Sequence, residues 1–110
     1  MSERERRLAE NEVAFREINE RLRDEVEAIA GADATFNVLC ECSSPACAVR
    51  IKVTPAEYES IHADAAQFIV ALGHSAPVIE TVVGGTDLYD VVRKRGEAAD
   101  VARAADESSQ

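Results

Sequence analysis

Cys40, Cys42 and Cys47 are the only cysteines of this 110-residue chain, and they lie within one short segment. The spacing Cys-x-Cys-x4-Cys places three thiols in a single loop, and cysteine thiolates are ligands that Zn²⁺ prefers in tetrahedral sites. Disulfides are a poor alternative, because the number of cysteines is odd and a bond between Cys40 and Cys42 would be strained. The pattern therefore predicts one zinc site.

The fourth ligand must come from elsewhere, and the sequence contains two histidines. His74 is the preferred candidate, because it follows the apolar run 68–72 and Gly73 permits a tight turn before it. His62 is the lesser candidate, since it lies in a predicted helix, where its ordinary role is an exposed side chain. An acidic side chain, a water molecule or no metal are the remaining alternatives. The predicted metal ligands are Cys40, Cys42, Cys47 and His74.

The rest of the sequence contains no recognisable catalytic motif. A zinc deaminase needs His-x-Glu or Cys-x-Glu followed by Pro-Cys-x-x-Cys, whereas here Glu41 follows Cys40 directly and no Cys-x-x-Cys is present. The motifs of zinc proteases, nucleophile elbows and phosphate loops are also missing. Four protein ligands would leave the zinc no open position for water. We therefore expect a non-enzymatic domain with a structural zinc, no catalytic residues and no other cofactor.

The composition is acidic, with 21 Asp and Glu against 12 Lys and Arg and a formal net charge of −9. Because such a chain is repelled by phosphate groups, nucleic acid and anionic membranes are poor partners. We expect a protein partner, or self-association through the N-terminal helix, in a protein-interaction or regulatory role. A thiol and zinc redox sensor is the main alternative, since bound thiolates can be oxidised and release the metal. A nucleic-acid-binding regulator is a weaker alternative.

The compartment is inferred from two features of the sequence. The N-terminal residues are largely charged and lack the apolar core of a signal peptide, and no run approaches the roughly 20 apolar residues of a membrane span. Cysteines that bind metal must stay reduced, which is the normal state of thiols in the cytosol. We therefore expect a cytoplasmic protein.

A long helix is predicted at the N-terminus, over residues 3–30. Apolar residues recur there every seven positions, at Leu8, Phe15, Leu22 and Ile29, with Ile18 and Val26 on the same face. Ser2 is a suitable N-terminal cap for this helix, and Gly31 is a suitable stop. The apolar face either packs on the helix's own domain or docks a partner or a second copy.

The remaining elements are short. Alternating residues predict strands over 35–40 and 48–53 on either side of the cysteine loop, and Thr54 followed by Pro55 predicts a helix over 55–63. A strand over 68–72, a hairpin of 78–83 with 88–93, and a helix over 96–105 complete the chain. The predicted fold is α+β: a long N-terminal helix, a small antiparallel sheet of hairpins and one or two short helices, stabilised by zinc. The predicted units are an amphipathic helix (1–31), a zinc-binding domain (32–105) and a disordered tail (106–110).

Several of these segments together resemble a family of small uncharacterised actinobacterial proteins. The shared segments are Asn11-Glu-Val-Ala-Phe-Arg-Glu-Ile-Asn-Glu20, the Cys-x-Cys-x4-Cys loop, Thr54-Pro-Ala-Glu-Tyr58, Gly73-His74, Tyr89-Asp-Val-Val92 and Gly96-Glu-Ala-Ala99. One departure is Ser75-Ala76, where the family has acidic residues after Gly-His. The resemblance covers nearly the whole chain and implies a shared fold and metal site. It implies no activity.

Overall fold

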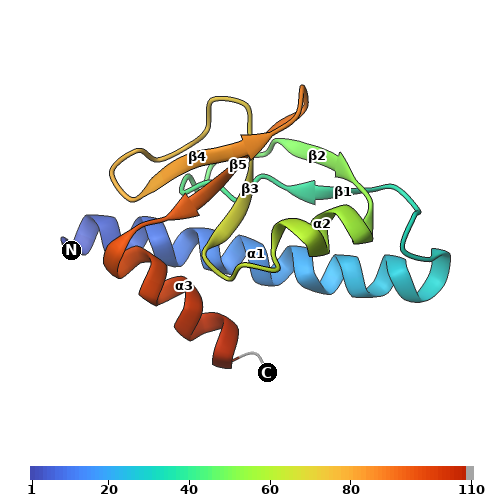
Figure 1. The fold of residues 1–110 in the computed structure, drawn as a ribbon, viewed down its shortest axis with the longest axis horizontal. Helices are drawn as coiled ribbons and strands as arrows, with labels where there is room; N and C mark the ends of the chain where they lie inside the picture. The colour runs from blue at the N-terminus through green and yellow to red at the C-terminus, as the bar shows by residue number, and fades with distance from the viewer. Residues whose placement is uncertain (109–110) are drawn as a thin grey trace.

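A computed structural model of the chain describes residues 1–108. The elements, in order, are α1 (Glu3–Ala30), β1 (Phe36–Leu39), β2 (Arg50–Val53), α2 (Pro55–Ile61), β3 (Gln67–Ala71), β4 (Glu80–Gly85), β5 (Tyr89–Lys94) and α3 (Gly96–Ser108). Figure 1 shows the strands on one side of α1, with α2 and α3 both packed against this helix and α3 near its N-terminal half. The predicted α+β class is confirmed.

The strands form two antiparallel sheets. β1 pairs only with β2, whereas the second sheet has the order β3-β5-β4, with β5 in the centre. The two sheets meet beside β3, where the backbone N–H of Glu41 donates to the carbonyl oxygen of Ile69 at 2.8 Å. Because Glu41 follows β1 directly, this contact brings the start of the cysteine loop against the edge of β3.

The residues of β2 alternate as a half-buried strand requires. In β2, Ile51 and Val53 are buried while Arg50 and Lys52 face solvent, as the sequence predicts. The segments 80–85 and 89–94 pair as the predicted second hairpin. Its two glycines belong to β4 rather than to the turn, and the pairing register shifts between Val82 and Gly84.

The ends of α1 and the start of α2 lie at the capping residues that the sequence predicts. The Ser2 hydroxyl accepts a hydrogen bond from the Glu5 backbone N–H at 3.1 Å, which satisfies one otherwise unpaired donor of α1. Gly31 ends α1 with φ +92°, a conformation that favours glycine. α2 begins with a complete capping box between Thr54 and Glu57. These predictions of helix ends are confirmed.

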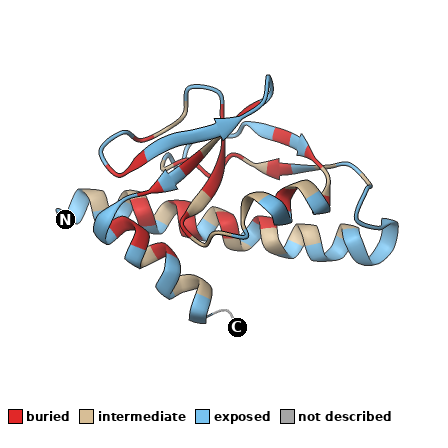
Figure 2. Cartoon of the chain, viewed as in Figure 1, coloured by how far each residue is buried: buried red, intermediate tan, exposed pale blue. Residues whose placement is uncertain are grey.

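The buried face of α1 differs from the predicted one. Its buried residues are Ala9, Glu12, Val13, Arg16 and Asn19. The predicted apolar face lies to one side of this row: Leu8, Phe15 and Leu22 are half-buried, and Ile29 is 87% exposed. Figure 2 shows that burial is concentrated in the middle of α1, while its C-terminal end is largely exposed. The helix does pack on its own domain, but it does so through a partly polar face.

Each polar residue on this face has a partner in the domain, which is why burial is tolerated. The guanidinium of Arg16 donates to the carbonyl oxygens of Ala65 at 2.6 Å and Ala102 at 2.9 Å, and it stacks over the ring of Phe68. Arg16 therefore ties α1 to α3 and to the turn before β3. The apolar periodicity does not reveal this face, because the packing depends on carbonyl groups that are distant in sequence.

A second buried tie joins α1 to the sheet through Lys94. Its ammonium group donates to the carboxylates of both Glu12 and Glu80, and all three side chains are fully buried. Burial raises the pKa of Glu12 from 4.5 to about 9; Lys94 opposes this rise and Glu80 adds to it. Glu12 therefore holds a proton at neutral pH.

This proton predicts that the folded protein becomes less stable as pH rises. The folded state keeps the Glu12 proton while the unfolded chain releases it, so the free energy of unfolding falls between pH 4.5 and about 9. The slope contributed by this one group is at most about 1.4 kcal/mol per pH unit. We expect Glu12→Gln, which does not titrate, to show a flatter dependence in urea denaturation across that window. Equal slopes in the two proteins would contradict the assignment.

α3 continues beyond its predicted end. It runs to Ser108, whose hydroxyl donates to the carbonyl oxygen of Ala104 at 3.0 Å, so 106–108 of the predicted tail are helical. Positions 109–110 of that tail lie outside the described residues. Across residues 1–108, none of the helices combines the length and the apolar character needed to cross a membrane.

Candidate metal centre

The three cysteines are brought together by the loop between β1 and β2. Cys40 follows β1 directly and continues the pairing, since its backbone N–H donates to the carbonyl oxygen of Val49 at 3.1 Å. A tight turn then reverses the loop, with the N–H of Cys47 bonded to the carbonyl oxygen of Ser44 at 3.2 Å. Asn11 of α1 stabilises this turn, because its side-chain amide donates to the carbonyl oxygen of Ser43 at 3.1 Å.

His74 reaches the cysteines from the turn that follows β3. Gly73 has φ +78°, and the backbone N–H of His74 donates to the carbonyl oxygen of Ala71 at 2.9 Å to close the turn. The carboxylate of Asp90 on β5 accepts from the Gly73 N–H at 3.0 Å and holds the turn in place. The tight turn inferred from Gly73 is therefore present.

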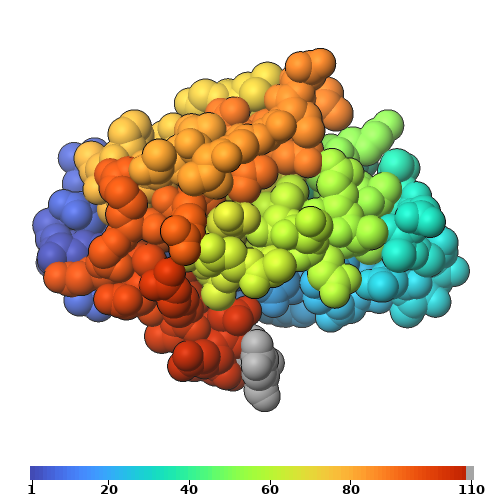
Figure 3. Space-filling view, in the orientation of Figure 1, coloured from blue at the N-terminus to red at the C-terminus, as the bar shows by residue number. Residues whose placement is uncertain are grey.

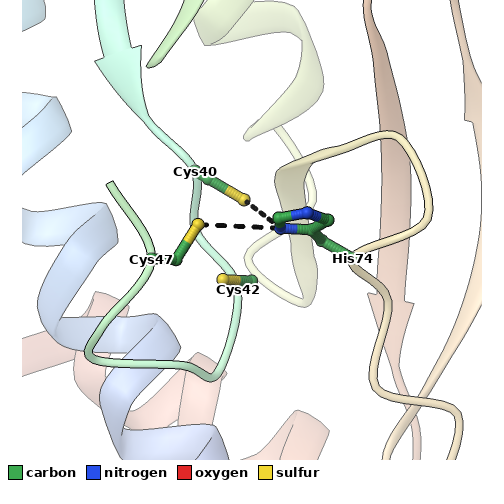
Figure 4. A group of neighbouring side chains, drawn as sticks. All are labelled: Cys40, Cys42, Cys47 and His74. Atoms are coloured by element: carbon green, nitrogen blue, oxygen red, sulfur yellow. Dashed lines mark hydrogen bonds between the residues drawn. The ribbon is translucent and has the colours of Figure 1, made fainter. Parts of the chain in front are cut away.

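The four side chains converge on one point (Figure 4). The His74 Nδ1 atom lies 3.7 Å from the Cys40 sulfur and 3.6 Å from the Cys47 sulfur. All four ligand atoms, including the Cys42 sulfur, lie within 4.8 Å of one another. In a zinc tetrahedron with Zn–S of about 2.3 Å and Zn–N of about 2.0 Å, the S···N edge is about 3.5 Å and the S···S edge about 3.8 Å. The spacing therefore fits a tetrahedral metal ion, and the Cys₃His group can hold one.

The environment of the thiols also fits a cation. Cys40 and Cys42 are buried, and Cys47 and His74 are partly exposed. Burial raises the pKa of Cys40 and of Cys42, although contacts with the backbone of Ala71 and Ser44 act against the rise. The backbone N–H of Ala71 points at the Cys40 sulfur at 3.1 Å, the kind of donor that stabilises a thiolate bound to metal. Without a cation these buried thiols stay protonated, which lowers their reactivity as free redox groups.

The turn at Gly73 gives a test of how His74 is positioned. A Cβ atom at this position would meet no other atom, so Gly73→Ala introduces backbone strain without a steric clash. The strain of a left-handed residue is about 1 kcal/mol or more, and relieving it would turn His74 away from the thiols. We expect Gly73→Ala to bind zinc more weakly in competition with a chromophoric chelator. Gly84→Ala, which has no close neighbour and no positive φ, is the control and should bind zinc as the wild type does.

Glu41 is a residue of the site that sequence reasoning missed. The loop around it is rich in serine and proline and predicts an exposed segment, yet Glu41 is fully buried. Its carboxylate accepts from Tyr58 Oη at 2.5 Å, from His62 Nε2 at 2.6 Å and from the Ile69 N–H at 2.9 Å. Burial by itself raises the pKa of Glu41, but the charge and hydrogen bond of His62 and the other donors outweigh it, so the pKa lies below its ordinary value.

His62 has a role different from either predicted one. Its side chain is only 7% exposed, and it stacks on the ring of Tyr58 with centroids 4.0 Å apart. One ring nitrogen faces the carbonyl oxygen of Tyr58 at 2.9 Å and the other faces the Glu41 carboxylate. Because both nitrogens already face oxygen atoms, His62 is not one of the side chains that converge with the cysteines. The expectation of an exposed helical side chain is wrong, because Glu41 attracts the ring into the core.

The chain matches no protein-family model, and neither curated proteins nor solved structures gave a match.

Proposed function

We propose that this protein is a non-enzymatic domain in which Cys40, Cys42, Cys47 and His74 bind one structural zinc ion. The observation that supports this most strongly is the convergence of three sulfurs and one imidazole nitrogen at the spacing of a zinc tetrahedron. Three thiolates and one histidine favour zinc over the hard cations Mg²⁺ and Ca²⁺, which prefer oxygen ligands. The ion would bind the β1–β2 loop to the turn after β3, two segments that share few other ties.

A structural role is favoured over a catalytic one by the number of protein ligands. Four ligands complete the coordination of a structural zinc, whereas catalytic sites keep one position for water or substrate. The one acidic residue inside the loop, Glu41, is enclosed by four hydrogen-bond donors and is not free to act as a general base. No other group at the centre has a role in proton transfer that the contacts support.

Metal content is the direct test. Protein purified without chelator is expected to contain one zinc per chain by mass spectrometry, and His74→Ala is expected to bind it more weakly. Ser44→Ala is the matched control, because Ser44 lies in the same loop and contacts Cys42 through its backbone oxygen only. Wild-type protein that binds no zinc would overturn the proposal and would favour free thiols, with redox chemistry as the next function to test.

We also propose that the C-terminal half of α1 binds a protein of net positive charge. Ile18 and Ile29 are 42% and 87% exposed there. By helical spacing, Ile18 and Ile29 share one exposed face of α1 with the acidic Glu25, and apolar and acidic groups together suit an amphipathic basic segment. Another side of α1 has two adjoining surface hollows of about 490 and 340 Å³ that share the acidic residues Glu20 and Asp24. The larger lies where α1, α2 and α3 meet, three elements that are neighbours in Figure 3. A second copy of this chain is disfavoured, because it carries the same net charge of −9.

The partner proposal is tested with a labelled lysine- and leucine-rich helical peptide and fluorescence anisotropy. We expect binding that weakens as salt rises. The double variant Ile18→Asp, Ile29→Asp should bind less, while Val49→Asp, which also replaces an exposed apolar residue outside α1, should bind normally. No binding at low salt, or a dimer by light scattering, would contradict this proposal without affecting the zinc site.

A further inference from the structure

Glu41 occupies a position that connects the metal centre to the helices. It lies between Cys40 and Cys42 in the sequence, so its backbone moves with two of the four ligands. Its side chain is fully buried and bonds to α1, α2 and β3 rather than to the cysteines or His74. The loop therefore presents thiols to one side and a carboxylate to the other.

The carboxylate joins three elements at once. Tyr58 and His62 reach it from α2 and its C-terminal cap, the Ile69 N–H reaches it from β3, and Asn19 reaches it from α1 at 3.0 Å. All of these donors need the carboxylate in one place, because hydrogen bonds weaken steeply when distance and angle change. A shift of the loop by an ångström would leave several buried donors unpaired.

Asn19 connects α1 to the Glu41 carboxylate and to β1. Its side-chain amide pairs with both backbone groups of Leu39, accepting from the N–H and donating to the carbonyl oxygen, each at 2.8 Å. It is also the last fully buried residue of α1, since 20–30 contribute none. The N-terminal half of the helix has separate ties through Arg16 and Glu12. The C-terminal half has Asn19 and half-buried apolar side chains.

We propose that Glu41 is a positioning residue that couples metal binding to the docking of α1 and α2. The metal fixes the loop, the loop fixes the carboxylate, and the carboxylate holds the two helices. Binding linkage is reciprocal, so contacts that hold the helices also strengthen metal binding, although none of them touches the metal. This inference rests on the proposed zinc site. It implies that loss of the metal loosens the C-terminal half of α1, the surface proposed above for partner binding.

The first experiment measures zinc affinity by competition with a chromophoric chelator. Tyr58→Phe removes only the hydroxyl that donates to Glu41, and we expect zinc to bind about tenfold more weakly, as for other groups that orient metal ligands indirectly. Tyr89→Phe is the matched control, since it removes a hydroxyl that donates at 2.6 Å to a different carboxylate, that of Glu57. A merely destabilising effect would act in both variants, whereas coupling through Glu41 acts only in Tyr58→Phe.

The second experiment uses wild-type protein and amide hydrogen exchange by NMR, with and without chelator. The Leu39 and Ile69 amides report on the contacts of Asn19 and Glu41, and the Arg95 amide, bonded to the carbonyl oxygen of Ile79, reports on the distant hairpin. We expect chelation to accelerate exchange at Leu39 and Ile69 much more than at Arg95. This measurement does not depend on whether a variant folds.

The outcomes separate the two proposals. Wild-type protein without zinc affinity would overturn the zinc site itself. Zinc binding with equal affinity in Tyr58→Phe and Tyr89→Phe, or equal acceleration of exchange at all three amides on chelation, would overturn the coupling and leave the zinc site standing.

Discussion

Cys42→Ser is expected to abolish tight zinc binding and to destabilise the whole domain. A metal that binds only the folded chain stabilises it by about 4 kcal/mol when its free concentration is about a thousand times the dissociation constant. For a chain of this length the loss lowers the melting temperature by on the order of 15 °C. The effect reaches beyond the loop, because Cys42 lies beside Glu41, on which contacts to α1, α2 and β3 depend.

Thermal unfolding followed by circular dichroism, in buffer with zinc and in buffer with chelator, measures this loss. Wild-type protein in chelator should approach the stability of Cys42→Ser, and chelator should change the variant little. Ser44→Ala should match the wild type in both buffers. A Cys42→Ser protein that melts at the wild-type temperature would show that the cysteines do not hold a structural metal.

Lys94→Met is expected to lower the free energy of unfolding by about 3–5 kcal/mol. The substitution keeps a side chain of similar length over the Phe68 ring but removes the ammonium group that both Glu12 and Glu80 contact. The buried carboxyl groups of Glu12 and Glu80 then lack the cation that they share, while Glu80 keeps its bond from the Ala76 N–H. Removing one partner of a buried charge group is harmful because the remaining charge stays desolvated.

Replacing Glu12, Lys94 and Glu80 together distinguishes the effect of an uncompensated buried charge from the effect of lost packing. The triple variant Glu12→Leu, Lys94→Met, Glu80→Gln leaves no ionisable side chain in this group and keeps an acceptor for the Ala76 N–H. Such replacements are often neutral or stabilising, so we expect the triple variant to recover most of the lost stability in urea denaturation. If the triple variant is as unstable as Lys94→Met, the contribution of Lys94 is packing rather than charge.

The sequence by itself determined those helices and strands whose ends or faces depend on residues close together in the chain. The caps at Ser2 and Thr54 predict helix starts because the hydroxyl bonds an amide only three residues away. Alternation predicts the β1–β2 hairpin because each strand needs one buried face. The spacing of the cysteines and the Gly73-His74 pair predicted the four residues that the structure brings together. This was possible because the type of each ligand and the turn that positions it depend on residues adjacent in the sequence.

Only the tertiary structure decided how α1 packs and which polar groups enter the core. The heptad of apolar residues predicted one face of α1, but the face beside it is buried, because Glu12, Arg16 and Asn19 find partners on β5, α3 and β1. His62 was expected at the surface and Glu41 was assigned no role, yet both side chains are buried and bond to each other. A buried polar side chain is stable only when its partners are in place, and most of those partners lie 17 or more residues away in the chain. The periodicity of apolar residues and the spacing of motifs in the sequence therefore do not predict such pairings.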